Sequence, residues 1–422
     1  MRLNVTSEIG RLKSVLVHLP GREIDQMIPP MMAQLLFDDI LYGQVAREEH
    51  RRFQQLIRFI ADDVIDLQDL LEETFEDPEV KNRVVRDLGK RNGLGRKLVS
   101  SLLELRPAAL AEVLIAGIAR ETGSGELPQF ELFPIPNLFF MRDPQVVLGD
   151  RVVISSMATQ ARRRESLLSK YVFEHHPRFR GRDPFWVDFM ATEPERPMPR
   201  STPTLEGGDV LVPRRDLLLV GVTERTNKAG VEALIRSLKA ANAGVTSVII
   251  VEIPRQRSFM HLDTIFTFIN RHECLIYPPV ILPRGSQAAK VTTVDLTKKR
   301  AEAYSEQKSL LGALKKKGFD LEPIYCGGDR AVDQQREQWT DGANAFALAP
   351  GIILLYERNV RTAEELARHG YHIVYEDDLL LGRTELETWT DKKYALQIAG
   401  NELSRARGGP RCMTMPLERE DL

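Results

Sequence analysis

The apolar positions of this chain follow one order that occurs several times. In residues 207–254, GGDVLVPRRDLLLVGVTERTNKAGVEALIRSLKAANAGVTSVIIVEIP, alternating apolar positions predict two strands around a polar Pro-Arg-Arg-Asp turn. Helical spacing follows, and a β-branched apolar run then predicts a third strand. The same order occurs in residues 344–378 and in residues 137–176, the latter continuing to PFWVDF at 184–189. The repeated unit is therefore ββαβ.

Two weaker copies bring the number of units to five. One occupies residues 12–71, with an amphipathic helix at 45–60. The other occupies residues 261–326, with a helix expected near 301–317. A unit that cannot bury its own apolar face has to be covered by its neighbours, as happens in radial arrays. We therefore predict an α/β fold, a five-bladed α/β propeller of ββαβ units.

Residues 76–125 interrupt the repeat. Their pattern is typical of two or three helices without a strand, and we predict a small inserted helical domain. The expected organisation is a first propeller blade in residues 1–75, the helical insertion in 76–125 and the remaining four blades in 126–422. The Pro-rich run at 192–204 is too polar for a core and is predicted to be a loop between units.

The charge balance excludes some partners. With 58 Lys and Arg against 60 Asp and Glu, the chain has no overall attraction to nucleic acid or to a membrane surface. It contains no run of about eighteen apolar residues, and its opening segment MRLNVTSEIGRLKSVLVHLP lacks the pattern of a signal peptide. We expect a cytoplasmic location. We also expect a homo-oligomer, because the exposed faces of a ring and of a helical insertion often associate.

Four stretches at predicted strand ends carry unusual polar side chains: NLFFMRDP, LEGGDVLV, FMHLDTIFTF and RGGPRCMTMP. They contain Asp143, Glu206, His261, Asp263 and Cys412, and the central mouth of a ring would gather such strand ends. His261 and Asp263 are two residues apart, so on a strand both would point to the same face. Each residue alone has an ordinary explanation: Asp-Pro initiates turns, a buried histidine is usually structural, and a free cysteine usually behaves as a small apolar residue.

Together these residues form a chemical set. The three cysteines lie far apart and form no C-x-x-C, which argues against disulfides and a thiolate zinc site and leaves Cys412 as a single reduced thiol. Carboxylates, an imidazole and a thiol suit a cationic substrate that is attacked by sulfur. A guanidinium is planar, permanently charged and bound bidentately by carboxylates. Its central carbon is a poor electrophile, so it needs a nucleophile as strong as a thiolate.

The motifs FFMRDP, EGGD, HLD and GGPRCMTMP resemble, in order and approximate spacing, those of the arginine deiminase family, which belongs to the guanidino-group modifying enzymes of the pentein superfamily. The resemblance extends over essentially the whole chain. Met141 departs from the family pattern, which has Thr at that position. The resemblance implies a five-bladed α/β propeller with a small helical domain inserted after the first blade. It also implies that L-arginine and water give L-citrulline and ammonia without a metal or an organic cofactor. This reaction is the first step of the arginine deiminase (dihydrolase) pathway of arginine degradation.

The same resemblance implies a role for each residue of the motifs. Asp143 and Asp263 bind the guanidinium, and Glu206 supports it next to His261. Cys412 attacks the central carbon, and His261 protonates the leaving ammonia. His261 then activates the water that hydrolyses the covalent amidino intermediate. The tail that carries Cys412 would return to the centre of the ring as the last strand of the last blade.

The α-carboxylate of arginine needs its own partners. Arg162 and Arg225 hold the same place in their repeats, at the exit of the second strand before the helix, so both would face the same mouth. A solvated helix start is the alternative explanation for either of them. Asn137 lies just upstream of the first acidic motif, and Arg407, just before the nucleophile, could order or cover the site. Asn137 and Arg407 also match substrate contacts of the family that the chain resembles.

Carboxylates around a thiol raise its pKa and disfavour the nucleophilic form. We therefore hypothesise that the positive charge of the substrate helps to generate the thiolate of Cys412. In the free enzyme the thiol would then be largely protonated near neutral pH.

Other functions remain open from the residues alone. A non-catalytic arginine sensor would need the acids but not the thiol. An amidinotransferase or a dimethylarginine hydrolase shares nearly the same central motifs, and the overall resemblance to the arginine-specific family, with Arg162 and Arg225 both present, favours that family. A metal-dependent hydrolase could use four polar residues of this chain as ligands, namely His261, Asp263, Glu206 and Asp209. Against this function, the sequence has no obvious further histidine nearby.

Overall fold

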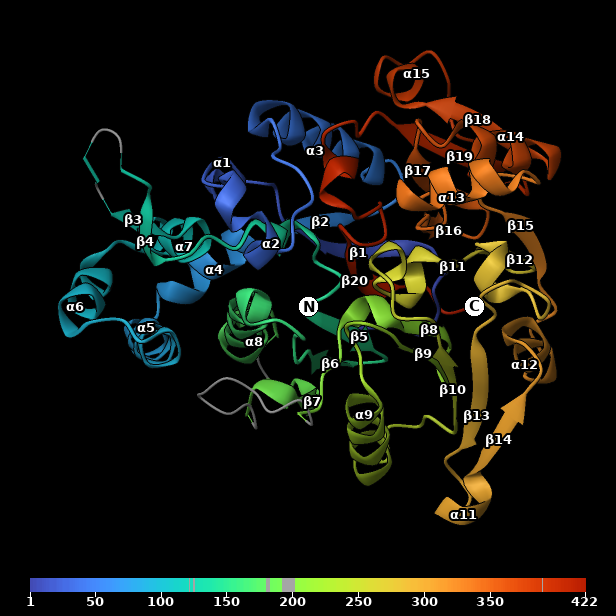
Figure 1. Cartoon of the computed structure of the whole chain (residues 1–422), viewed down its shortest axis with the longest axis horizontal. Coiled ribbons are helices and arrows are strands. Elements are labelled where there is room, and N and C mark those ends of the chain that lie inside the picture. Colours follow the sequence, from blue (N-terminus) through green and yellow to red (C-terminus); the bar gives the residue numbers. More distant parts are fainter. Residues whose placement is uncertain (121, 124–125, 180–182, 192–201, 389) are drawn as a thin grey trace.

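The computed structural model describes residues 1–120, 122–123, 126–179, 183–191, 202–388 and 390–422. Within these ranges the strands form five sheets of three to five strands and one two-stranded hairpin. In the view of Figure 1, strands β1, β5, β8, β11 and β16, one from each of the five larger sheets, lie around the middle of the molecule. The chain is therefore an α/β protein whose sheets approach a common centre.

The five larger sheets contain the following strands in spatial order: β2 (Asp63–Asp66), β1 (Leu12–Val17) and β20 (Met415–Arg419); β5 (Gln145–Leu148), β6 (Arg151–Ile154) and β7 (Phe185–Asp188); β14 (Tyr304–Gln307), β13 (Lys290–Asp295), β10 (Ser247–Glu252), β9 (Leu217–Val222) and β8 (Val210–Arg214); β11 (Phe266–Asn270), β12 (Glu273–Ile276) and β15 (Glu322–Tyr325); β16 (Phe346–Ala349), β17 (Ile352–Tyr356), β19 (Lys393–Ile398) and β18 (Tyr371–Tyr375). The α-helices outside the predicted insertion are α1 (Arg22–Asp25), α2 (Met32–Leu35), α3 (Gly43–Ile57), α4 (Leu67–Phe75), α8 (Arg163–His175), α9 (Lys228–Ala240), α10 (Pro278–Ile281), α11 (Arg300–Ala303), α12 (Leu310–Lys316), α13 (Ala331–Trp339), α14 (Val360–Arg368) and α15 (Glu376–Leu380).

The ββαβ order, with the third strand paired to the second, is present in two of the three clearest units and in one of the two weaker ones. Strands β8 and β9 pair antiparallel, α9 follows, and β10 then pairs parallel with β9. The same order joins β5, β6, α8 and β7. It also joins β11, β12, α12 and β15. A parallel neighbour needs a crossover connection, and the helix provides it. These predicted units are confirmed.

Three details differ from the sequence prediction. The segment predicted as one helix near 301–317 contains α11, β14 and α12, and β14 extends the third sheet through β13. In the predicted unit at 344–378, β16, β17, α14 and β18 follow in the expected order, but β19 lies between β17 and β18, so the third strand of this unit does not pair with the second. The C-terminal strand β20 was expected in the last blade, and this was wrong, because β20 pairs antiparallel with β1. It thereby covers the edge of β1 that β2 leaves open, and an unpaired edge is a site of aggregation.

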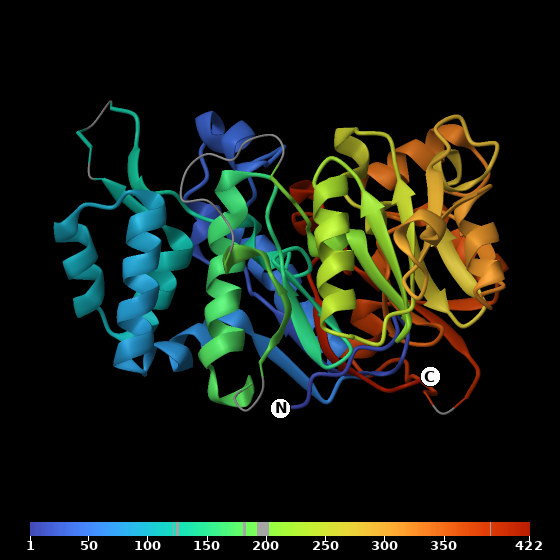
Figure 2. The ribbon, with the colours of Figure 1, turned by 90° about the horizontal axis from the view of Figure 1, so that it is seen from below.

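Helices α5 (Pro78–Asn92), α6 (Arg96–Glu104) and α7 (Pro107–Ala116) lie within the predicted insertion, at one end of the molecule in Figures 1 and 2. The carboxylate of Asp77 caps α5 by accepting from the backbone N–H of Glu79 and Val80, and Gly93 ends it in the left-handed conformation with φ +66°. A strand was not predicted here, but β3 (Ile118–Arg120) forms a hairpin with β4 (Gln129–Leu132). Of the predicted loop at 192–204, residues 192–201 lie outside the described residues.

The apolar core joins the helices to the sheets. Leu88 of α5 and Leu110 of α7 belong to the same buried cluster as Val152 of β6. A second cluster unites the third, fourth and fifth sheets, and a third cluster contains Cys412 together with residues of α3 and the fifth sheet. Among the described residues, no helix is both long and apolar enough to cross a bilayer.

Candidate active site

The predicted site residues come from equivalent places in different sheets. Asp143 lies two residues before β5, and Glu206 lies before a short 3-10 turn, Gly207–Asp209, that leads into β8. Asp263 lies in a 3-10 turn, Leu262–Thr264, before β11, and Cys412 lies before β20. We expected His261 and Asp263 on one strand, and this was wrong, since the segment is a turn. The turn nevertheless leaves both side chains buried beside the same thiol.

Two glycines allow these segments to approach each other. A Cβ at Gly207 would lie 2.0 Å from the carbonyl oxygen of Arg142. A Cβ at Gly208 would lie 2.8 Å from the ring of His261 and 2.9 Å from a carboxylate oxygen of Asp143. Real Cβ atoms do not approach so closely, which explains why the motif that follows Glu206 has two glycines.

His261 lies between two carboxylates. Its Nε2 is 2.8 Å from Oε2 of Glu206, and its Nδ1 is 3.6 Å from Oδ1 of Asp143. Burial favours the neutral imidazole, but Asp143, Glu206 and Asp209 outweigh it and raise the pKa of His261 to about 10. Burial would raise the pKa of Glu206, but the hydrogen bond from His261 and the charges of Arg225 and Arg162 lower it to about 2. The pair is therefore an imidazolium and a carboxylate at neutral pH.

Cys412 lies beside the other aspartate. Its Sγ is 3.8 Å from Oδ2 of Asp263, and only 4% of the residue is exposed. Burial, and then the negative charges of Asp263, Asp143 and Asp341, raise the pKa of the Cys412 thiol well above its usual value. In the free site, burial and these charges therefore favour the protonated thiol over the thiolate.

Arg162 lies among the acids. Its Nη1 is 2.7 Å from Oδ2 of Asp143 and 3.9 Å from Oε2 of Glu206, and its Nη2 is 2.8 Å from Oε2 of Glu165. Burial raises the pKa of Glu165 to about 7 in spite of Arg162. In this structure the guanidinium of Arg162 is thus bound by carboxylates.

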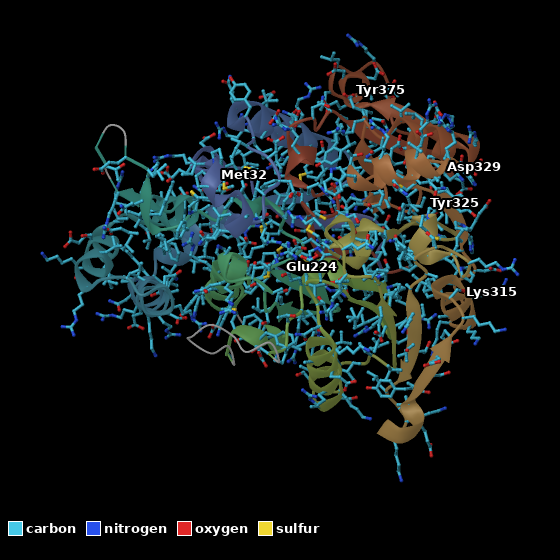
Figure 3. All side chains as sticks on the ribbon, viewed as in Figure 1. Met32, Glu224, Lys315, Tyr325, Asp329 and Tyr375 are labelled. Carbon is cyan, nitrogen blue, oxygen red and sulfur yellow. The ribbon has the colours of Figure 1, made fainter. Side chains whose placement is uncertain are left out.

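A cavity next to Cys412 brings the predicted residues together. Seven of the nine line it, namely Asn137, Asp143, Arg162, Arg225, His261, Arg407 and Cys412. The other two contact residues that line it: Glu206 is hydrogen-bonded to His261, and Asp263 lies beside the sulfur of Cys412. The volume is about 20 Å3, which is roughly the space that one water molecule needs. In the view of Figure 3 the exposed Glu224, the neighbour of Arg225, lies near the middle of the picture, whereas Lys315 and Tyr375 lie toward its edges.

The basic residues of the cavity differ in their partners. Arg225 is buried, and its Nε and Nη1 have no hydrogen-bond partner among the described residues. The same holds for Nε and Nη1 of Arg407, whose guanidinium carbon stacks 3.3 Å from the ring centroid of Trp339. The side-chain amide of Asn137 donates to the carbonyl of Leu35 at 2.7 Å. Arg225 and Arg407 are therefore the residues with free donors for an anionic group.

The sequence analysis missed three residues that contact the site. Arg411 donates to Oδ2 of Asp263 at 2.7 Å and to the carboxylate of Glu8. Asn344 contacts the backbone of Cys412 and of Asp263. Arg411 directly precedes Cys412 in the motif GGPRCMTMP, and this adjacency is the signal that would have identified it. Glu8 and Asn344 precede the first strands of their sheets, and this shared repeat position is the signal that would have identified them.

The acids also form the one group of candidate metal ligands within the described residues. Ligand atoms of Asp143, Glu206 and His261 lie within 4.8 Å of one another. The cationic Arg162 is already bonded to Asp143, and a protonated His261 offers no lone pair at the nitrogen that donates to Glu206. Asp209, a ligand in the metal-hydrolase alternative, instead accepts from Leu262 N–H and Thr223 Oγ. The charges therefore disfavour a metal cation at this point.

The chain is similar to arginine deiminases along its whole length. The arginine deiminase family model matches residues 33–129 and 111–419. The arginine deiminase of Clostridium perfringens (strain SM101 / Type A) is 36% identical over 441 residues, which cover 100% of this chain and 98% of that protein. The arginine deiminase of Staphylococcus aureus (strain JH9) is 33% identical over 444 residues, covering 100% and 99%.

Solved structures share the fold at lower identity. The amidinotransferase SxtG from Microseira wollei superposes with a TM-score of 0.51 at 14% identity, covering 100% of this chain and 98% of that protein. A mutant of AgrE in a binary complex with L-arginine gives a TM-score of 0.51 at 14% identity, covering 98% of this chain and 40% of that protein. Since the family model and relatives above 30% identity extend over essentially the whole sequence, the chain belongs to the arginine deiminase family.

Proposed function

We propose that this protein hydrolyses L-arginine to L-citrulline and ammonia through a covalent intermediate on Cys412. One observation carries the proposal: the buried atoms without a hydrogen-bond partner around the thiol match the two ends of arginine. Oδ1 of Asp143 and Oδ1 of Asp263 are acceptors for a guanidinium, and Arg225 and Arg407 supply donors for a carboxylate. Membership of the arginine deiminase family supports the same substrate.

In the first half-reaction the guanidinium is held by Asp143 and Asp263. The thiol of Cys412 releases its proton to solvent water when the cationic substrate binds, and the thiolate forms a bond to the guanidinium carbon. His261, protonated because its pKa is raised to about 10, transfers a proton to the departing nitrogen, which leaves as ammonia. An amidino thioether on Cys412 remains, and Glu206 stabilises and orients the imidazole.

In the second half-reaction His261 is neutral and acts as a base toward water. The oxygen of this water forms a bond to the amidino carbon, the bond from carbon to sulfur breaks, and citrulline is released. His261 regains its proton and Cys412 regains its thiol form. The same group thus serves as acid and then as base, and neither step requires a metal.

The cavity has to enlarge for this chemistry. Its volume of about 20 Å3 is too small for arginine, so lining side chains move when the substrate binds. We propose that Arg225 and Arg407 bind the α-carboxylate and that Asn137 borders it. For Arg162 to bind the α-carboxylate as well, as the repeat position suggested, it would have to exchange the carboxylate of Asp143 for that of the substrate.

At the level of architecture, the five larger sheets are proposed to be the five blades of an α/β propeller. The first blade is proposed to occupy residues 1–75, the helical insertion 76–125 and the other blades 126–422. The pairing of β20 with β1 supports this arrangement, because it joins the end of the chain to its beginning. A cytoplasmic location and association into homo-oligomers complete the proposal.

Mass spectrometry of the intact protein tests the reaction. After addition of arginine, the His261→Ala variant should form the amidino adduct on Cys412 slowly, since His261 also protonates the leaving nitrogen, and should then retain it, since its hydrolysis needs the imidazole. The Cys412→Ser variant should form neither adduct nor citrulline. His272→Ala, which changes an exposed histidine, serves as the control and should turn over normally. Citrulline formation by Cys412→Ser would contradict the proposal.

A further inference from the structure

The repeat leaves two strand-entry positions without a chemical role. Three sheets supply reacting groups from the segment before their first strand, namely Asp143 before β5, Glu206 before β8, and His261 with Asp263 before β11. The equivalent segments of the two remaining sheets hold Glu8, before β1, and Asn344, before β16. Both side chains are at least nine-tenths buried, and Asn344 is not exposed at all.

Asn344 joins the nucleophile to the substrate-binding acid. Its Oδ1 accepts from the backbone N–H of Cys412 at 3.1 Å, and its Nδ2 donates to the backbone carbonyl of Asp263 at 3.0 Å. Its own carbonyl accepts from the N–H of Arg411 at 3.4 Å. Since one partner is a donor and the other an acceptor, a side-chain amide satisfies both, whereas a carboxylate would satisfy only the donor.

Glu8 acts on the same segment from the first sheet. Its two carboxylate oxygens accept from Nε and Nη2 of Arg411 at 3.1 and 3.2 Å, and it also accepts from the N–H of Val212. The Nη1 of Arg411 is thereby directed to Oδ2 of Asp263, at 2.7 Å. Such a bidentate pair fixes the plane of a guanidinium. The other oxygen of Asp263 remains without a hydrogen-bond partner among the described residues.

We propose that Asn344 and Glu8 are positioning residues, which hold the backbone of Cys412 and, through Arg411, the carboxylate of Asp263 in register with each other. This inference rests on the proposed function, because it takes Cys412 as the nucleophile and Asp263 as a guanidinium ligand. The two sheets whose first strands follow no reacting group thus supply the two positioning residues. Asn344 and Glu8 together fix the distance between Sγ of Cys412 and Oδ2 of Asp263, which is 3.8 Å.

The decisive variant is Asn344→Ala, compared with Asn359→Ala. Asn359 is equally buried, and its amide likewise accepts one hydrogen bond and donates one, but both partners belong to Thr340. A misplacement of about 1 Å lowers turnover about 10²-fold. We expect this loss in kcat for Asn344→Ala and close to wild-type kcat for Asn359→Ala, with both thermal midpoints measured to normalise for folding.

Alkylation of Cys412 by iodoacetamide gives a readout that turnover does not affect. Asn344→Ala releases the Cys412 backbone from Asp263, which should weaken the effect of the Asp263 carboxylate on the pKa of the thiol. Cys412 should therefore be alkylated at a lower pH in Asn344→Ala than in Asn359→Ala. The isosteric Asn344→Asp keeps the acceptor for Cys412 N–H but adds a negative charge, so it should alkylate only at higher pH. This variant decides the question where the alanine variant does not fold. Glu8→Gln should lower kcat about tenfold, because one charged partner of Arg411 is lost.

Two results would overturn the inference. One is a kcat of Asn344→Ala, per folded molecule, within threefold of that of Asn359→Ala. The other is an alkylation profile of Asn344→Asp that coincides with that of the unaltered chain. A failure of the proposed function would be distinguishable, since it would appear as absence of citrulline from the unaltered chain, whereas the alkylation comparison needs no turnover.

Discussion

Binding of a guanidinium should convert Cys412 from thiol to thiolate. In the free site burial and three aspartates raise the pKa of this thiol, and the nearest carboxylate oxygen, from Asp263, lies 3.8 Å from the sulfur. A guanidinium held by the other oxygen of Asp263 would bring a positive charge to about the same distance. The perturbation is therefore addition of one further cation next to the sulfur, in a site whose own cations, His261 and Arg411, are already paired with carboxylates.

The size of the effect follows from Coulomb's law. Two unit charges about 4 Å apart interact by about 4 kcal/mol at an effective dielectric constant of about 20. Since about 1.4 kcal/mol corresponds to a factor of ten in an equilibrium, the ligand should increase the ratio of thiolate to thiol about 10³-fold. Movement of Arg162 away from the acids would reduce this gain, because one cation would then partly replace another.

Ultraviolet absorbance of the thiolate measures the conversion directly. The protein is titrated with pH alone, with an N-alkylguanidinium that is not turned over, and with the neutral N-alkylurea of the same shape. Cys412→Ser supplies the background, and burial raises the pKa of Cys274 and Cys326 so that these thiols stay silent. A titration that the guanidinium leaves unchanged, or that the urea shifts equally, would refute the electrostatic reasoning.

Two further predictions concern the other end of the site and the fold. Arg225→Gln should reduce kcat/KM for arginine about 10-fold to 100-fold, since a charged hydrogen bond contributes about 1.5–3 kcal/mol. It should leave kcat/KM for agmatine, which lacks the carboxylate, nearly unchanged, and an equal loss for both would contradict the assignment. His18 is buried 3.3 Å from both Glu23 and Asp66, which overcome burial and raise its pKa to about 10. Because this folded-state pKa exceeds the unfolded value of 6.5, the stabilisation is full below pH 6.5 and disappears as the pH rises through 10. In denaturant unfolding, the free energy of unfolding of His18→Gln should therefore be lower than that of the unaltered chain by a few kcal/mol near pH 6, and this difference should shrink toward pH 10.

The sequence predicted what depends on periodicity. Alternating and helical spacing in 207–254 identified β8, β9, α9 and β10, since both strands of that hairpin are buried and apolar. Polar residues at the entry to apolar strands identified Asp143, Glu206 and His261, because a carboxylate or imidazole there has no reason in packing alone. Their convergence near Cys412 then followed from the equivalent repeat positions.

Features that depend on pairing over long distances were not predictable in this way. Nothing local in the tail indicates that β20 pairs with β1, about 400 residues away. The turn at His261 was taken for a strand because two residues with an apolar neighbour between them fit either structure. Arg162 was expected to face the substrate carboxylate, yet a buried cation binds the nearest uncompensated acids, here Asp143 and Glu165.

The polar atoms near Cys412 that have no hydrogen-bond partner among the described residues indicate which ligand the proposed site would select. Each buried polar atom that lacks a hydrogen bond costs about 1–3 kcal/mol. Two such acceptors, on Asp143 and Asp263, and two such donors on each of Arg225 and Arg407 surround the thiol. A ligand with only a cation would satisfy the acceptors and leave the arginines unpaired, and a simple carboxylate would do the reverse. On the proposed function, a ligand that carries both groups at the right separation pairs all of these atoms at once, so we expect selectivity for arginine to depend on these side chains more than on the shape of a preformed cavity.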